Sequence, residues 1–360
     1  MGTKLRSLVT GAGGFVGHHL VSFLRARGHW VRGVDLKRPD FCASDANEFE
    51  LLDLRRWENC VRATREIDEV YALAAEIGEI DGTFPDHAQI LEDNCLINFH
   101  CIDAARQNHV SRYLYTSSAS VYPEPWYGTT SRVPQKEGDV RPDAPQDANE
   151  RTNLVSERLC VHYRRSYGLE TRIVRLGDVF GPVGPWFGGK EKAPTALCCK
   201  IAAAQLEGLN EIEICGDGRQ TGSFCYIDDC VMGLHKVMRS DCSEPLNLRP
   251  DRTVSINELA DIVANIAGVR LCKKYLPGSQ RLRECTSDNT GLKELLRWEP
   301  KTPLEEGLKR TYLWVEKQVR EVALEYSFGI VTFPPRPGNK SRPRSPLERP
   351  FLVSKREHDR

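Results

Sequence analysis

The sequence lacks several patterns that would place a protein outside the ordinary globular classes. No run approaches the ~18 apolar residues of a membrane-spanning helix, and no secretory signal pattern opens the chain. Net charge is absent as well, since 50 Lys and Arg residues balance 50 Asp and Glu residues. Such a balance offers no chain-wide attraction for nucleic acid or for an anionic membrane surface. We therefore expect a cytoplasmic protein that binds neither nucleic acid nor membrane.

The 13 cysteines show no metal or disulfide pattern. Their number is odd, no Cys-x-x-Cys spacing occurs, and Cys198 and Cys199 are adjacent. This scatter is untypical of zinc sites and of disulfide frameworks. We predict mostly buried, reduced thiols and no metal site.

The chain is long enough for about two domains of roughly 150 residues each. Its first half alternates short apolar runs with helical patterns, which is typical of a doubly wound parallel sheet. The expected strands and helices cover 5–10, 18–27, 31–35, 68–73, 88–107, 112–116, 147–167 and 171–176. We predict an α/β protein with three parts. The first is a Rossmann-type domain over 1–180, and the second is a smaller C-terminal substrate-binding lobe over 181–328, some segments of which return to the first domain. The third is a basic, disordered tail over 329–360.

A glycine-rich turn, Gly-Ala-Gly-Gly-Phe-Val-Gly, runs from Gly11 to Gly17 between a predicted strand and a predicted helix. Gly11 makes the tight turn, Gly14 lets backbone amides approach a pyrophosphate, and Gly17 brings the helix close to the sheet. The helix N-terminus adds about half a unit of positive charge toward the phosphates. The alternative is a glycine turn without a ligand.

Asp35 ends the second predicted strand, 18 residues after Gly17. A carboxylate at this point accepts hydrogen bonds from ribose hydroxyls and repels a 2′-phosphate, which favours NAD over NADP. Arg32, Lys37 and Arg38 lie close by and weaken that preference. The predicted NAD-binding residues are Gly11, Gly14, Phe15, Val16, Gly17, Asp35, Asp53, Leu54, Leu73, Ala74 and Ala75.

With this glycine spacing, residues 5–320 resemble the extended short-chain dehydrogenase/reductase superfamily and its NAD-dependent epimerase/dehydratase family. Within it, the chain is most similar to the GDP-mannose 3,5-epimerase family, through the motifs at 145–148, 186–194, 216–221 and 287–289. The resemblance implies that NAD oxidises a nucleotide sugar at C4, that an acid/base pair inverts C3 and C5, and that hydride then returns. It also implies a GDP-mannose-like ligand and a homodimer.

The family's hydride step uses a Tyr-x-x-x-Lys pair, whose i, i+4 spacing places both side chains on one helix face. The lysine lowers the pKa of the tyrosine, which then takes the sugar hydroxyl proton. Asn149 and Asn153 stand at these two positions, and none of the 11 tyrosines has a lysine four residues later. An amide neither titrates nor carries charge, so this pair is not competent.

The resemblance places further catalytic positions at Ser118, at Ser120 in place of the acid/base cysteine, and at Lys192, the retained second acid/base group. It also implies a set of substrate contacts at Gly78, Asp178, Lys192, Gln220 and Arg283. Asp178 replaces the family's asparagine, and Gly222 replaces an arginine that holds the nucleotide phosphates.

Three hypotheses follow from these substitutions. We favour an NAD-binding member of the family that is weak or inactive as an epimerase. The alternative is an active NAD-dependent GDP-sugar epimerase or isomerase in which Glu150 or Asp178 serves as a replacement base, although Glu150 points about 100° away from Asn149 on a helix. The third is an engineered or damaged copy of an active enzyme.

Overall fold

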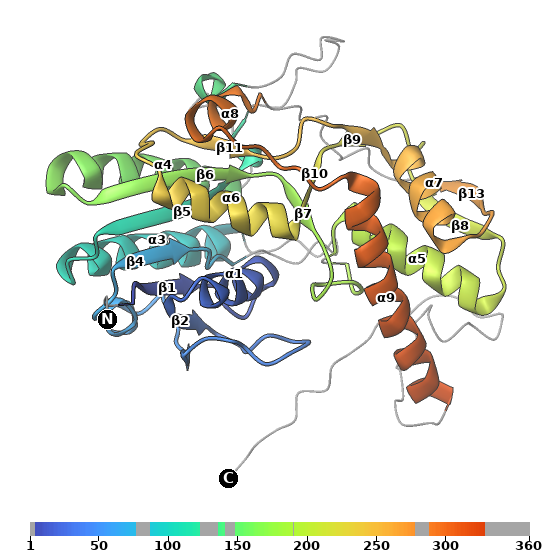
Figure 1. Ribbon diagram of the computed structural model, residues 1–360, viewed down its shortest axis with the longest axis horizontal. Helices are drawn as coiled ribbons and strands as arrows, with labels where there is room; N and C mark the ends of the chain where they lie inside the picture. Colours follow the sequence, from blue (N-terminus) through green and yellow to red (C-terminus); the bar gives the residue numbers. More distant parts are fainter. Residues whose placement is uncertain are drawn as a thin grey trace.

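The computed structural model describes residues 4–76, 87–122, 136–140, 148–189, 191–277 and 288–327. Its centre is a seven-stranded sheet in the order β11-β6-β5-β4-β1-β2-β3, in which every neighbouring pair is parallel (Figure 1). The strands are β1 (Arg6–Thr10), β2 (Trp30–Asp35), β3 (Glu48–Leu51), β4 (Glu69–Ala72), β5 (Arg112–Ser118), β6 (Glu170–Leu176) and β11 (Leu246–Leu248). The predicted α/β class with a Rossmann-type sheet is confirmed.

Helices cover both faces of this sheet, as the alternation of side chains along a buried parallel strand requires. Val9 of β1 packs in one apolar core with α1 and α6, and its neighbour Leu8 packs in a second core with α2, α3 and α4. Both side chains are at most 1% exposed. These helices are α1 (Phe15–Ala26), α2 (Trp57–Thr64), α3 (His87–Gln107), α4 (Ala148–Tyr167) and α6 (Ile227–Arg239). None of the helices in the described ranges is long and apolar enough to cross a membrane.

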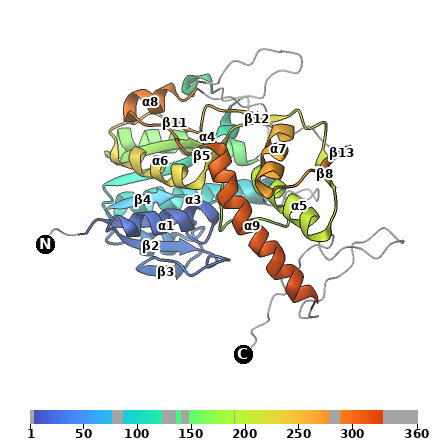
Figure 2. The ribbon, with the colours of Figure 1, turned by 45° about the vertical axis from the view of Figure 1, so that its right-hand side comes forward.

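A second lobe, built largely from the later part of the chain, lies beside the sheet (Figure 2). Its three packed helices are α5 (Ala193–Glu207), α7 (Ile256–Ala267) and α9 (Leu304–Ser327). The start of α7 follows from its sequence, because Ser255 and Glu258 form a reciprocal capping box there. Its short strands are β8 (Glu211–Cys215), β9 (Thr221–Gly222), β12 (Val254–Ser255) and β13 (Cys272–Leu276).

Several segments connect this lobe to the central sheet. β11 pairs with β6 at the edge of the main sheet, and α8 (Thr290–Leu296) packs on β11. β7 (Asp178–Phe180) continues from β6 and pairs with β10 (Phe224–Tyr226) of the lobe. Two short 3-10 helices, η1 (Ala119–Val121) and η2 (Glu137–Asp139), complete the described elements. The carboxyl ends of β5 and β6 therefore face the second lobe.

The strand and helix positions expected from the sequence agree with the structure to within three residues. The largest difference is at α1, which begins at Phe15 because Gly14 is its N-cap, with extended backbone angles of φ −82° and ψ 172°. The domain boundaries at 180 and 328 remain predictions. Gly78, Arg283 and the tail over 329–360 lie outside the described residues.

Candidate functional site

The glycine turn between β1 and α1 leaves no space for side chains at three positions. Gly11 has a positive φ of 69°, and a Cβ added there would lie 2.9 Å from the carbonyl of Leu73. A Cβ on Gly17 would lie 2.1 Å from the carbonyl oxygen of Gly11, and one on Gly13 would lie 2.2 Å from the carbonyl oxygen of Lys37. Substitution at any of the three must move backbone, so the chain can pass this closely beneath α1 only with glycine.

The end of β4 is fixed against the same turn. The hydroxyl of Thr10, which is 1% exposed, accepts hydrogen bonds from the amides of Leu73 and Ala74, each at 3.1 Å. The first turn of α1 contains no acidic residue, so nothing in it neutralises the positive end of the helix dipole. Leu73, Ala74 and the glycine turn are thus brought together at one edge of the sheet, as the dinucleotide hypothesis requires.

Asp35, at the end of β2, is held rigidly beside this turn. Its Oδ2 accepts from the amide of Gly13 at 2.9 Å, and its Oδ1 accepts from the amide of Lys37 at 3.1 Å. A carboxylate in this place binds a ribose diol and repels a 2′-phosphate.

Of the three basic residues that the sequence places near Asp35, one is engaged inside the domain. Arg32 is only 8% exposed and donates to the carbonyls of Ala63 and Arg65, so it is not directed at a ribose phosphate. Lys37, which pairs with Asp40 at 2.5 Å, and Arg38 stay on the surface after β2. The basic charge beside Asp35 is thereby reduced to these two residues.

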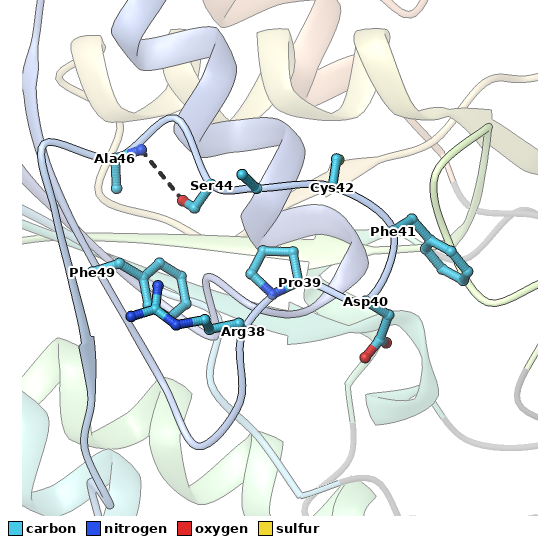
Figure 3. A pocket seen from close by; sticks show the side chains of 9 residues that line it. Arg38, Pro39, Asp40, Phe41, Cys42, Ser44, Ala46 and Phe49 are labelled. Atoms are coloured by element: carbon cyan, nitrogen blue, oxygen red, sulfur yellow. Dashed lines mark hydrogen bonds between the residues drawn. The ribbon is translucent and has the colours of Figure 1, made fainter. Parts of the chain in front are cut away.

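A cavity of about 630 Å³ lies beyond Asp35 and is lined by the loop that connects β2 to β3 and by the start of β3 (Figure 3). The loop that lines it is joined to α1, because Cys42 Sγ lies 3.0 Å from His18 Nε2. Burial lowers the pKa of His18, so its imidazole is neutral near pH 7. The lining residues are Arg38, Pro39, Asp40, Phe41, Cys42, Ala43, Ser44, Ala46 and Phe49.

The remaining predicted cofactor residues have structural contacts of their own. Both carboxylate oxygens of Asp53 accept hydrogen bonds from Arg55 at 2.9 Å, which lowers the pKa of Asp53. Leu54 is 4% exposed in the core. Phe15 fills the space in front of Gly184, where a Cβ would meet its ring at 2.5 Å. Val16 is half-buried, and Ala75 is exposed just after β4.

Two of the predicted catalytic positions meet at the carboxyl end of β5. Ser118 ends this strand, opposite Leu176 of β6, and its hydroxyl accepts a hydrogen bond from the amide of Ser120 at 3.1 Å. Asp178 follows two residues after Leu176, and its Oδ1 lies 2.8 Å from Nζ of Lys192 at the N-cap of α5. We call Ser118, Ser120, Asp178 and Lys192 the carboxyl-edge cluster.

Asn153 lies on α4 and is turned into the protein. It is 8% exposed, and its Oδ1 accepts a hydrogen bond from the hydroxyl of Tyr115 at 2.8 Å. Asn98 donates to the same phenol oxygen at 3.4 Å and to Ser156 Oγ at 2.8 Å. Burial raises the pKa of Tyr115, so this phenol is a proton donor to the amide. Asn149 belongs to the same helix, but its side chain lies outside what the structure describes.

Two further positions on the lobe side differ in their surroundings. Gln220 is half-buried, and its Oε1 is itself buried without a hydrogen-bond partner within the described part of the chain. At Gly222, a Cβ would lie 2.8 Å from the ring of Phe224. The ring therefore occupies part of the space that a longer side chain would need.

A buried ion pair beneath the carboxyl-edge cluster was missed from the sequence. The Arg175 guanidinium of β6 donates to both carboxylate oxygens of Glu157 on α4, at 2.7 and 2.9 Å. Ser117 also donates to Glu157, at 2.6 Å, and Arg175 donates to Tyr122, which in turn donates to Asn247. A charged residue inside the apolar run of β6 is the one sequence signal that could have found it.

Comparison with known proteins places these features in a family. Residues 7–248 match the NAD dependent epimerase/dehydratase family. The chain is 40% identical over 320 residues to GDP-mannose 3,5-epimerase 1 of Oryza sativa subsp. indica, covering 88% of this chain and 83% of the relative. It has the same identity over the same length to GDP-mannose 3,5-epimerase of Arabidopsis thaliana, covering 88% and 84%.

A solved structure agrees with these sequence relatives. UDP-glucose 4-epimerase of Thermotoga maritima, determined with UDP-glucose, superimposes with a TM-score of 0.77 at 25% identity, over 88% of this chain and all of that one. The glycine turn, the open N-terminus of α1 and the fixed Asp35 carboxylate fit the dinucleotide, and NAD is the cofactor. The protein belongs to the NAD-dependent epimerase/dehydratase family.

Proposed function

We propose that this protein binds NAD and a GDP-mannose-like nucleotide sugar but has weak or no activity as a 3,5-epimerase. The observation that carries the proposal is Asn153, which stands at the lysine position of the family and accepts a hydrogen bond from buried Tyr115. A neutral amide engaged in the core supplies no charge to a neighbouring phenol. Asn149 supplies no phenol.

The chemistry that remains is incomplete. Bound NAD is able to accept a hydride from a sugar carbon, but a group must remove the hydroxyl proton as the hydride leaves. Ser118 and Ser120 carry hydroxyls of high pKa, and Lys192 is paired with Asp178. Loss of one positioned acid/base group lowers a rate by about 10²–10⁴-fold, and here the tyrosine and the lysine are both replaced.

Restoring the pair tests the proposal. In the double variant Asn149→Tyr with Asn153→Lys, we expect GDP-mannose to reduce bound NAD, measured as absorbance of NADH, with little reduction in the unmodified protein. Asn149→Phe with Asn153→Met is the matched control, because it fills similar space without an acid or base. Chromatography of the sugar then shows whether Ser120→Cys and Gly222→Arg are also needed for epimerisation.

The alternative function is an active epimerase with a relocated base. Asp178 favours it, since this carboxylate lies at the carboxyl edge of the sheet beside Lys192. Rapid turnover of GDP-mannose by the unmodified chain, lost in Asp178→Asn, would establish this alternative and contradict the proposal.

We also propose that the protein is a homodimer that joins through α3 and α4. These neighbouring helices expose Phe99, at 40%, and Val155, at 45%, on the outer side of the domain. Light scattering after gel filtration should give twice the mass of one chain, and Phe99→Glu should give a monomer. Lys309→Glu, on exposed α9 surface, is the control and should leave the mass unchanged.

A cytoplasmic location completes the proposal. Its support is the state of the cysteines, since all 12 in the described ranges are free thiols. Free thiols in this number are typical of proteins in reducing compartments. Fractionation of the source cells with an antibody to the protein tests it.

A further inference from the structure

The carboxyl-edge cluster contains one ion pair that joins the two lobes. Asp178 is the first residue of β7, and Lys192 precedes α5 of the second lobe. Their charged atoms lie 2.8 Å apart, within charge-assisted hydrogen-bond distance. The side chains are 35% and 56% exposed, so both remain accessible to a ligand.

This ion pair lies where the fold binds ligands. Ligands of doubly wound sheets bind outside the carboxyl ends of the strands. Asp178 follows the end of β6 by two residues and stands level with Phe224 in the β7–β10 pair. A ligand bound outside this edge would therefore lie on the side of the sheet that carries Asp178 and Lys192.

We propose that Asp178 sets the charge preference of the sugar end of the site, so that it accepts a neutral hexose and disfavours a hexuronate. This inference rests on the proposed nucleotide-sugar function and names the class of sugar. The pair has no net charge, so Lys192 offers little attraction to a further carboxylate. A hexuronate that approached Lys192 would also approach the Asp178 carboxylate, and like charges brought together oppose binding.

A neutral hexose meets no such opposition. Its hydroxyl groups can donate hydrogen bonds to the Asp178 carboxylate while the ion pair stays in place. Replacing Asp178 by asparagine would keep the shape of the side chain and leave the Lys192 ammonium without its counter-charge. That ammonium would then attract a sugar carboxylate.

Calorimetric titration of the full-length, NAD-loaded protein with GDP-mannose and with GDP-mannuronate tests the inference. In the unmodified protein we expect GDP-mannose to bind more tightly. Asp178→Asn should raise the affinity for GDP-mannuronate relative to GDP-mannose by roughly tenfold. Glu191→Gln is the matched control. It removes a carboxylate that neighbours Lys192 in sequence but accepts a hydrogen bond from the amide of Gly189. This variant should change the ratio of the two affinities less than about twofold.

Repeating the substitution in a Lys192 variant separates the effect of charge on sugar affinity from the effect of side-chain shape. In Lys192→Gln, the further change Asp178→Asn should no longer favour GDP-mannuronate, because the ammonium is gone. The inference is overturned if the gain persists in that background, if Asp178→Asn changes both affinities equally, or if the unmodified protein binds both sugars equally. Failure of every variant to bind either nucleotide sugar would instead overturn the proposed function.

Discussion

The glycine turn at 11–17 and the carboxyl-edge cluster lie at the same side of one sheet, yet they differ in how much change they tolerate. In the turn, backbone atoms fill the space that any side chain would need at Gly11 and Gly17. In the cluster, side chains are half-exposed and the ion pair of Asp178 and Lys192 can change without moving backbone. The turn therefore depends on backbone space that no side chain can share, whereas the cluster consists of side chains that can be exchanged.

The buried ion pair beneath the cluster resembles the glycine turn in tolerating little change. The buried pair of Arg175 and Glu157 is at most 6% exposed and ties α4 to β6. It performs no chemistry on a ligand, yet it fixes the strand ends from which Ser118 projects. The pair thus supports the strand ends at this edge without being part of the exposed cluster.

The largest expected effect tests this buried ion pair. Glu157→Gln leaves the buried Arg175 charge without its counter-ion, so we expect the free energy of unfolding to fall by about 3–5 kcal/mol in urea titration. Glu306→Gln, which removes the exposed partner of Arg310 on α9, should cost less than about 1 kcal/mol. Equal, small losses would show that the buried pair is dispensable and would remove it from the comparison.

The next effect tests the turn itself. Gly17→Ala places a methyl group against the carbonyl of Gly11, and we expect a loss of about 3 kcal/mol in stability and no measurable NAD binding. Gly14→Ala, where the added atom would be 3.3 Å from the same carbonyl, should cost less than about 1 kcal/mol in stability. Normal NAD affinity in Gly17→Ala would contradict the steric argument.

Acid should weaken the packing around His235 of α6, whose ring contacts Phe23 and His29. Burial, together with the nearby charges of His29, Arg27 and Lys236, lowers the pKa of His235 from 6.5 to about 4. The unfolded chain therefore binds this proton first, so the stability that His235 contributes is complete above about pH 6.5 and is lost as the pH falls toward 4. Because His235 is only half-buried, solvent screening reduces the full linkage energy, and we expect a loss of about 2 kcal/mol in urea titrations over that interval.

His235→Asn supplies the control for this pH dependence. The variant removes the titrating group, so its stability should change less between pH 6.5 and 4 than that of the unmodified protein. The same dependence of stability on pH in both proteins would assign the acid sensitivity to other groups. Candidates are His18, His19 and His29, whose pKa values are also lowered by burial.

The smallest effect concerns cofactor choice. Asp35→Ser removes the carboxylate beside the ribose, and we expect NAD affinity to fall by about tenfold, or about 1.4 kcal/mol, while NADP affinity rises. Asp40→Asn, which removes the partner of Lys37, should change NAD affinity much less. Tighter binding of NADP than of NAD by the unmodified protein would contradict the role of Asp35.

The parts of the molecule that depend on local pattern could be predicted from the sequence. The glycine turn and the strand ending at Asp35 follow from short-range spacing and apolar runs, and the structure places them as expected. The burial and the partners of charged side chains could not be predicted in this way. Arg32 lies three residues before the end of β2, but its burial among the carbonyls at the C-terminal end of α2 depends on a tertiary contact.

The same limit applies to the candidate site. The sequence predicts that Asn153 stands at a catalytic position of the family, but the direction of its side chain depends on the hydroxyl of Tyr115, which is 38 residues away in the chain. The sequence likewise names Asp178 and Lys192 separately. Their contact arises only because β7 and the start of α5 fold against each other.

The hydrogen bond between Tyr115 and Asn153 has a consequence for any variant that places a lysine at position 153. Asn153→Lys would leave the buried Tyr115 hydroxyl without its acceptor, at a cost of about 1–3 kcal/mol. Positions 115 and 153 are therefore energetically coupled, and a lysine at 153 avoids this cost only if the hydroxyl at 115 is removed with it.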